Sequence, residues 1–257
     1  ADQSVMRTTL IPGLLQAVCH NAHRQNLDLK LFELGRVFFP REGQDLPEEM
    51  EAISGVLSGL REEETWSKPK AECDFFDLKG SLETLLDGLG VTGYQFLPER
   101  DEPFLHPGKA CRIEVNKRSL GIMGEAHPDL GAAFEIKQKL FLFELNFQSL
   151  VESCQENRSF NPLPRFPSVT RDLALVVDER IAAGDILHTL WQANAGLIAE
   201  IRIFDLYRGK PIPPGVKSLA FRIEYQREDR TLTDAEVNEF HQKMIELLAQ
   251  RYGAVLR

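Results

Sequence analysis

Apolar and polar positions in residues 157–257 follow two periods, that of a helix and that of a strand. Apolar residues recur three and four positions apart over 184–195 and 233–247, as on the buried stripe of an amphipathic helix. Shorter segments alternate or are continuously apolar, as strands are. These predicted strands lie at 172–177, 198–207, 218–226 and 252–256. The order strand, helix, strand, strand, helix, strand predicts a βαββαβ ferredoxin-like domain, the topology of RRM-like folds.

A sheet of this topology leaves one face uncovered by helices, and RNA-binding domains of similar topology stack nucleotides there. If the aliphatic residues of the two middle strands face the helices, then Arg202, Phe204 and Arg222 meet on the open side. Guanidinium groups beside an aromatic ring suit phosphate pairing and base stacking. The alternative is an ordinary solvated sheet face with cross-strand ion pairs, such as Arg222 with Glu200.

The segment before residue 156 mixes helical and strand patterns. A stripe of apolar residues after Pro12 predicts one amphipathic helix, and a second helix begins at Asp74. Strands are predicted at 29–39, 52–60, 110–115, 120–124 and 140–147. This arrangement predicts an antiparallel sheet, so the whole chain falls in the α+β class.

Charge divides the chain near residue 156. Residues 1–156 carry 16 basic and 26 acidic side chains, against 14 and 13 in residues 157–257, which agrees with the overall net charge of −9. Between them, residues 153–170 contain Pro162, Pro164 and Pro167, as a stiff linker does. We therefore expect domains at 1–156 and 157–257, and any RNA bound by the chain should contact the second, because an acidic surface repels phosphate.

Composition narrows the class of protein further. The 257 residues lack an initiator Met and any apolar run long enough for a signal peptide or membrane span, so we expect an internal part of a longer protein that does not contact a membrane. Cys19, Cys73, Cys111 and Cys154 have neither zinc-site spacing nor the density of a disulfide framework. A cytoplasmic location is the simplest expectation.

Two patterns in the first domain resemble functional sites. The G-x-G-x-x-G match at 88–93 follows a predicted helix and precedes a strand, the reverse of what dinucleotide binding requires, so a helix end and turn is favoured. His20 and His23 could share a helix face, but no Cys or third His has a suitable spacing, so no metal site is predicted. The remaining histidines form no catalytic triad, and no catalytic residue is assigned.

Longer motifs carry a resemblance to a known family. In the second domain they are RFPSVTRDLA (165–174), FDLYRG (204–209), KSLA (217–220) and RTLT (230–233). In the first they are MRTTLIPGLL (6–15), LFELG (31–35), DFFDLKG (74–80), HPG (106–108) and GEAHP (124–128). In order and spacing they resemble the C-terminal part of the β subunit of bacterial phenylalanyl-tRNA synthetase, which ends in a ferredoxin-fold anticodon-binding domain.

The resemblance implies an inactive class II synthetase-like domain at 1–156 and an anticodon-binding domain at 157–257. Residues 221–224 resemble the ATP-binding second motif of class II synthetases, but they lie in the small C-terminal sheet, and no Gly-rich third motif is present. Catalysis is thus expected in a partner α subunit, within a heterotetramer of two α and two β subunits. ATP and Mg²⁺ are expected in the whole enzyme, and no cofactor in this chain. The editing site of the family would lie upstream of Ala1.

The expected role is to dock the α subunit and to bind the anticodon stem-loop of tRNA(Phe). Arg171, Arg208 and Lys210 lie within matched motifs and are expected at the edges of the RNA-binding face formed by Arg202, Phe204 and Arg222. Two other functions remain open. One is a purely structural assembly module without RNA contact. The other is a single-chain, organellar-type synthetase, which predicts ATP–pyrophosphate exchange by this chain alone.

Overall fold

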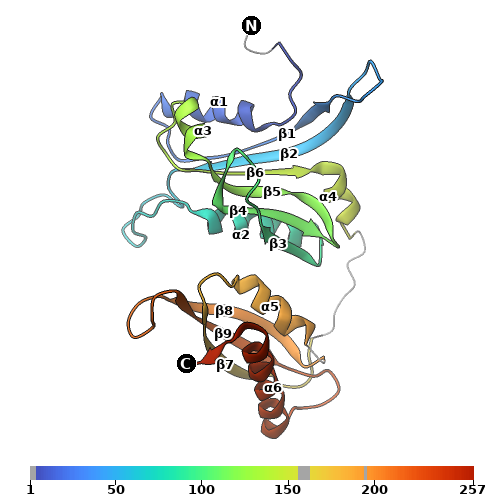
Figure 1. The fold of residues 1–257 in the computed structure, drawn as a ribbon, viewed down its shortest axis with the longest axis vertical. Helices are drawn as coiled ribbons and strands as arrows, with labels where there is room; N and C mark the ends of the chain where they lie inside the picture. The colour runs from blue at the N-terminus through green and yellow to red at the C-terminus, as the bar shows by residue number, and fades with distance from the viewer. Residues whose placement is uncertain (1–3, 156–162, 194–195) are drawn as a thin grey trace. The chain divides into compact units, whose positions relative to one another are not determined.

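The structure is a computed structural model that describes residues 4–155, 163–193 and 196–257. The chain divides into two compact units, Ala1–Ser159 and Phe160–Arg257, and each is described by itself (Figure 1). The predicted boundary after residue 156, and Pro162 of the predicted linker, lie outside the described residues.

The N-terminal unit is built on a six-stranded antiparallel sheet with the strand order β1-β2-β6-β5-β4-β3. Its strands are β1 (Leu29–Phe39), β2 (Glu48–Ser58), β3 (Tyr94–Pro98), β4 (Leu105–Val115), β5 (Arg118–Ala126) and β6 (Leu140–Asn146). The predicted antiparallel sheet is confirmed. The strand expected after the glycine-rich match at 88–93 is β3, whose bounds were not predicted because this edge strand has no fully buried residue.

Helices cover both faces of this sheet (Figure 1). On one face lie α1 (Ile11–Ala22) and α3 (Pro128–Ala133), and on the other α2 (Phe75–Gly88) and α4 (Phe147–Ser153). The predicted helix after Pro12 is confirmed as α1, which buries Leu14, Leu15 and Val18. The predicted helix at Asp74 is confirmed as α2, with Asp74 as its N-cap.

The N-terminus of α1 is capped by a side chain from a distant strand. Its N-cap residue, Leu10, makes no side-chain capping bond of its own. Instead, Glu144 of β6 accepts a hydrogen bond from the Leu10 backbone N–H at 2.8 Å and one from the Thr9 hydroxyl at 2.9 Å. Burial raises the pKa of Glu144, while these donors act in the opposite direction. The carboxyl group therefore ties the start of α1 to the sheet.

The C-terminal unit has the predicted ferredoxin-like order. Its elements are β7 (Val169–Asp178), α5 (Ala183–Gln192), β8 (Ile198–Tyr207), β9 (Val216–Tyr225), α6 (Asp234–Tyr252) and β10 (Val255–Leu256). The strands form an antiparallel sheet in the order β10-β7-β9-β8. The predicted start of the last strand at 252 is wrong, because α6 continues to Tyr252 and ends at Gly253, which has a left-handed backbone conformation.

The core of the C-terminal unit lies between one face of this sheet and the two helices. Leu219, Phe221, Ile223 and Tyr225 of β9 are at most 2% exposed and pack with residues of α5 and α6, as their alternation predicts. The Tyr225 hydroxyl is 2.9 Å from Nδ1 of His241 on α6. No helix among the described residues of this unit covers the other side, which we call the open face.

Candidate nucleic-acid interface

Three residues predicted to bind RNA meet on the open face. Arg202 of β8 lies directly opposite Arg222 of β9 in the strand register. A bulge follows in β8, where Ile203 pairs with Phe221 but Asp205 pairs with the next residue of β9. The extra residue is Phe204, and the guanidinium carbon of Arg222 lies 5.0 Å from its ring centroid. Phe204 is 52% exposed, so its ring is partly free to stack on a base.

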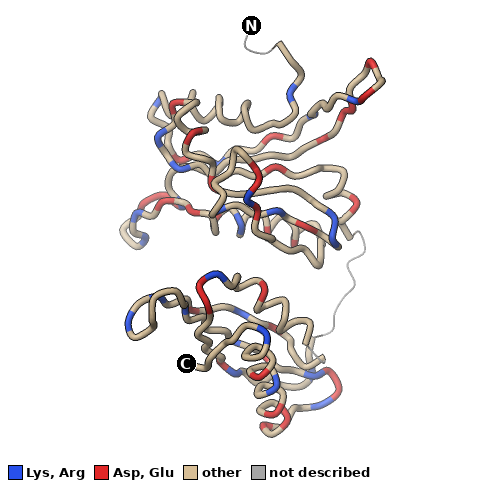
Figure 2. Tube along the Cα trace, in the orientation of Figure 1, with Lys and Arg blue, Asp and Glu red and all other residues tan. Residues whose placement is uncertain are grey.

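Both arginines of this group are already paired with carboxylates. Arg222 makes two hydrogen bonds of 2.8 Å to Asp172 of β7, and the pKa of Asp172 is lowered by that pairing. Arg202 bonds to Glu200 on its own strand at 2.5 Å. The sequence suggested, as an alternative to RNA binding, an ion pair between Arg222 and Glu200. That pair does not form, because Arg222 bonds to Asp172 and Glu200 bonds to Arg202. Acidic and basic residues are interspersed over this unit (Figure 2).

The open face is not strongly basic. By strand register its carboxylates are Asp172, Asp178, Glu200, Asp205 and Glu224, and its guanidinium groups among the described residues are those of Arg202, Arg222 and Arg257. Positive charge on this face is therefore balanced, and any RNA phosphate would have to compete with the carboxylates for the paired arginines.

Arg257 and Tyr207 form a second cation–aromatic pair that the sequence reasoning missed. The bulge at Phe204 shifts the alternation of β8, so Tyr207 lies opposite Ser218 on the open face. The Arg257 backbone N–H bonds to the Ala174 carbonyl, and its guanidinium carbon lies 5.1 Å from the Tyr207 ring centroid. Arg257 also donates to the Ser218 hydroxyl at 3.4 Å. Among the described residues, no carboxylate forms an ion pair with Arg257.

The predicted edge residues occupy different surroundings. The Tyr207 hydroxyl donates a hydrogen bond of 2.5 Å to the Lys210 carbonyl, which fixes the turn between β8 and β9, and the Lys210 side chain is exposed. Arg208 bonds to Glu179 at 2.8 Å and lowers the pKa of that carboxyl. Both residues lie at the hairpin end of the sheet. They could contribute to a basic edge there.

Arg171 does not border the open face. It shares strand parity with the buried Leu173 and bonds to α6, through Asp234 at 2.7 Å and Asn238 at 3.3 Å. Its predicted position at the edge of the RNA-binding face is therefore wrong. The guanidinium holds the start of α6 against β7, where it also bonds to the carbonyl of Thr170.

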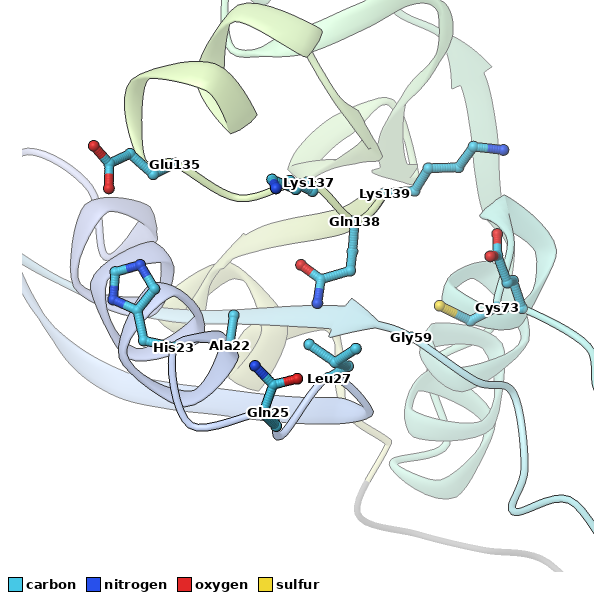
Figure 3. A pocket seen from close by; sticks show the side chains of 11 residues that line it. Ala22, His23, Gln25, Leu27, Gly59, Cys73, Glu135, Lys137, Gln138 and Lys139 are labelled. Carbon is cyan, nitrogen blue, oxygen red and sulfur yellow. The ribbon is translucent and has the colours of Figure 1, made fainter.

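The N-terminal unit contains a pocket of about 930 Å³ at the C-terminal end of α1 (Figure 3). Its lining mixes charges of both signs, with Lys137 and Lys139 against Glu72 and Glu135. His23 also lines it, with Nε2 at 3.9 Å from the Cys19 sulfur. The described residues contain no group of three or more His, Cys, Asp or Glu side chains that could hold a metal ion.

The glycine-rich match at 88–93 lies between the end of α2 and the start of β3, as expected for a helix end and turn. Gly90 and Gly93 have positive φ angles of 73° and 71°, which suit a turn. Residues 221–224 lie inside β9. Neither pattern is in the context that its nucleotide-binding counterpart requires.

Both units of the chain match models of known protein families. The C-terminal unit matches the family model of the ferredoxin-fold anticodon binding domain over residues 164–257, and the N-terminal unit matches that of the phenylalanyl tRNA synthetase beta chain CLM domain over residues 1–147. The fold and the first of these matches place residues 164–257 in the anticodon-binding class of ferredoxin-like domains. The chain belongs to the family of phenylalanyl-tRNA synthetase β chains.

Relatives named phenylalanine–tRNA ligase β subunit match the whole chain. Those of Syntrophotalea carbinolica, Geobacter sulfurreducens and Moorella thermoacetica are 43%, 40% and 41% identical over 100% of this chain and 32% of their own length. The chain thus spans about a third of these relatives. A solved pyrrolysyl tRNA synthetase of Desulfitobacterium hafniense aligns with 56% of this chain and 48% of its own, at 13% identity and a TM-score of 0.43. Among the described residues, no helix is both long and apolar enough to cross a membrane.

Proposed function

We propose that the chain is the C-terminal part of the non-catalytic β subunit of a phenylalanine–tRNA ligase. Its N-terminal unit docks the catalytic α subunit in a heterotetramer of two α and two β subunits, and its C-terminal unit binds the anticodon stem-loop of tRNA(Phe). Membership of the β-chain family supports this proposal. ATP and Mg²⁺ belong to the catalytic subunit, and no step of the chemistry is assigned to residues of this chain.

The observation that carries RNA binding is the pairing of Arg257 with Tyr207 on the open face of an anticodon-binding fold. A guanidinium without a carboxylate partner among the described residues, held on a ring and beside the Ser218 hydroxyl, is available to pair with a phosphate or a base edge. Phe204 adds an exposed ring, and stacking of one base on an aromatic side chain contributes about 1–3 kcal/mol. We therefore expect Arg257 to contact RNA together with Arg202, Phe204 and Arg222.

The test is a titration of tRNA(Phe) into the complete two-subunit enzyme at several salt concentrations. Arg257→Ala should weaken binding about tenfold, because one charge-assisted contact is lost. Arg251→Ala is a matched control, since Arg251 also stacks on a tyrosine, Tyr252, but lies on α6. Equal affinity of the Arg257 variant and the unaltered enzyme would contradict the assignment.

Docking of the catalytic subunit is supported by an exposed apolar strip on the edge strand β1. Phe32 is 74% exposed and Leu34 54% exposed, and they lie opposite Gly55 and Ile53 of β2. Ile53 packs with the core under α2, so the strip lies on the α2 side of the sheet. Large apolar side chains gathered on an edge strand are typical of a protein interface.

Subunit association in the complete enzyme tests this surface. Phe32→Asp should weaken association of the two subunits, because a carboxylate would be buried without a partner. The control is Leu46→Asp, which alters an equally exposed side chain in the turn between β1 and β2. If both variants assemble like the unaltered protein, as judged by native mass spectrometry, β1 is not the docking strand.

The mixed charge of the open face favours one other function, an assembly module that does not contact RNA. Its arginines would then serve only to pair with Asp172 and Glu200. In that case the affinity for tRNA(Phe) would be unchanged by substitutions anywhere on the open face, while subunit association would be retained.

A further inference from the structure

Residues 60–72, which follow β2, form a projecting hairpin that we call the Trp66 arm (Figure 1). Leu60 and Glu72 form a β-bridge at its base, and Thr65 and Lys68 exchange backbone hydrogen bonds of 3.3 and 3.2 Å near its tip. Trp66 lies in the tight turn between them. Its side chain is 100% exposed, so the largest apolar side chain in the arm has no packing partner within the described residues.

The base of the arm is fastened to two elements of the N-terminal unit. Arg61 bonds to Asp74 at 3.0 Å and to Asp77 at 2.8 Å, both at the start of α2. Its carbonyl accepts a bond of 2.8 Å from Lys30 of β1. The arm is therefore held in place before any partner binds, which lowers the conformational entropy lost when Trp66 is buried.

A second exposed ring lies beside this base. Phe76, in the first turn of α2 between Asp74 and Asp77, is 72% exposed. The strip formed by Phe32 and Leu34 lies on the same side of the sheet as α2. Exposed aromatic side chains near one another mark protein interfaces, and tryptophan is enriched among residues that dominate binding energy.

Charge on the arm decides between protein and nucleic acid as the partner. Glu62, Glu63 and Glu64 precede the turn, and only Glu62 forms an ion pair among the described residues, with Lys68. Of the arm's charged side chains without an ion pair among the described residues, Glu63, Glu64 and Glu72 outnumber Lys70. This acidic excess disfavours RNA phosphate and favours a surface that carries Lys or Arg.

We propose that the Trp66 arm is a docking element that inserts the indole into an apolar pocket bordered by basic side chains on the catalytic subunit. This inference depends on the proposed docking role and adds a second contact site to β1. Phe76 widens the apolar contact, and Glu63 and Glu64 meet the basic border. The bonds at the base of the arm fix the place of the turn that carries Trp66.

The main test measures the dissociation constant of the two subunits in the complete enzyme. Trp66→Ala should weaken association about 30-fold, as expected for loss of a central aromatic anchor. Trp191→Ala, which removes a 43% exposed indole from α5, is the control and should have no effect. Glu63→Lys combined with Glu64→Lys should also weaken association, whereas Glu42→Lys in the turn between β1 and β2 should not.

A photo-reactive phenylalanine at position 66 of the assembled enzyme identifies the partner. A crosslink to a catalytic-subunit peptide containing Lys or Arg is the expected result. A crosslink to tRNA, a crosslink to a second copy of this chain, or no crosslink would each overturn the proposal. If Trp66→Ala has no effect but Phe32→Asp disrupts association, the inference about the arm fails while the proposed docking role stands.

Discussion

The guanidinium of Arg257 lies over the ring of Tyr207, although the two residues belong to opposite edges of the C-terminal sheet. Tyr207 ends β8, and Arg257 follows β10, so their contact spans the two strands between these edges. Ser218, below them on β9, is only 3% exposed despite facing the open side. The pair therefore covers one end of this face and holds a cation there.

Tyr207 has two separable roles in this arrangement, one for its ring and one for its hydroxyl. Tyr207→Phe keeps the ring under Arg257 but removes the bond to the Lys210 carbonyl, which should cost about 1 kcal/mol of unfolding free energy. Tyr207→Ala removes both and should also weaken tRNA(Phe) binding. Urea unfolding and tRNA titration of the two variants check this. Equal tRNA affinity of both would show that the ring is not needed.

Arg202 and Arg222 can be tested together because both lie on the open face and both are paired. The double change to Ala leaves Asp172 and Glu200 without their cations, so tRNA(Phe) binding should weaken and the slope of log affinity against log salt should fall by about 2. Asp172→Asn releases Arg222 and should strengthen binding at low salt. A salt titration in which neither change has an effect would remove these arginines from the interface.

Glu144 should be needed for its acceptor oxygens rather than for its charge. Glu144→Ala leaves the Leu10 N–H and the Thr9 hydroxyl without their acceptor, which should lower the unfolding free energy by about 1–3 kcal/mol. Glu144→Gln keeps one acceptor oxygen and should cost less. Urea unfolding of the two variants distinguishes them, and equal losses would contradict the capping role.

The stability of the C-terminal unit should depend on the ionisation of His241. Burial, aided by the nearby Arg171 guanidinium, lowers the pKa of His241 from its ordinary value of 6.5. The unfolded chain therefore takes up this proton more readily than the folded chain. The unfolding free energy should be highest above about pH 6.5 and should fall as the pH drops below that value.

The matched variant is His241→Gln, which does not titrate and whose amide can still bond to the Tyr225 hydroxyl. Its urea midpoint should change less between about pH 7 and pH 5 than that of the unaltered chain. Parallel pH profiles of the two proteins would show that His241 is not the responsible group.

Where one face of a strand is fully buried, the sequence was sufficient to predict the fold. In β9 the alternation of Leu219, Phe221 and Ile223 assigns each residue to its face, and the capping box at Thr233 marks the start of α6. The same rule applied to Leu173 and the residues that follow it in β7 would have placed Arg171 on the helix side. The position of Arg171 was predicted wrongly because the strand was expected to begin at residue 172, whereas β7 begins at Val169.

The remaining features of the open face depend on contacts that local patterns do not encode. The bulge at Phe204 reverses the alternation of β8, and only pairing with β9 reveals it. Arg257 reaches Tyr207 across strands that are distant in sequence. The pairing of Arg222 with Asp172 likewise depends on the register between β7 and β9. The alternation of residues along the strands was enough to predict that Arg202, Phe204 and Arg222 share one face of the sheet. It could not show which of the arginines are paired with carboxylates.

The bond between Glu144 and the Leu10 N–H has a consequence for the order in which the chain matures on the ribosome. The two residues are 134 positions apart, so α1 leaves the exit tunnel long before its cap is synthesised. Closing so long a loop is entropically costly and requires most of the sheet to be assembled first. The first helix of this unit is therefore among the last of its parts to become fully stabilised during translation.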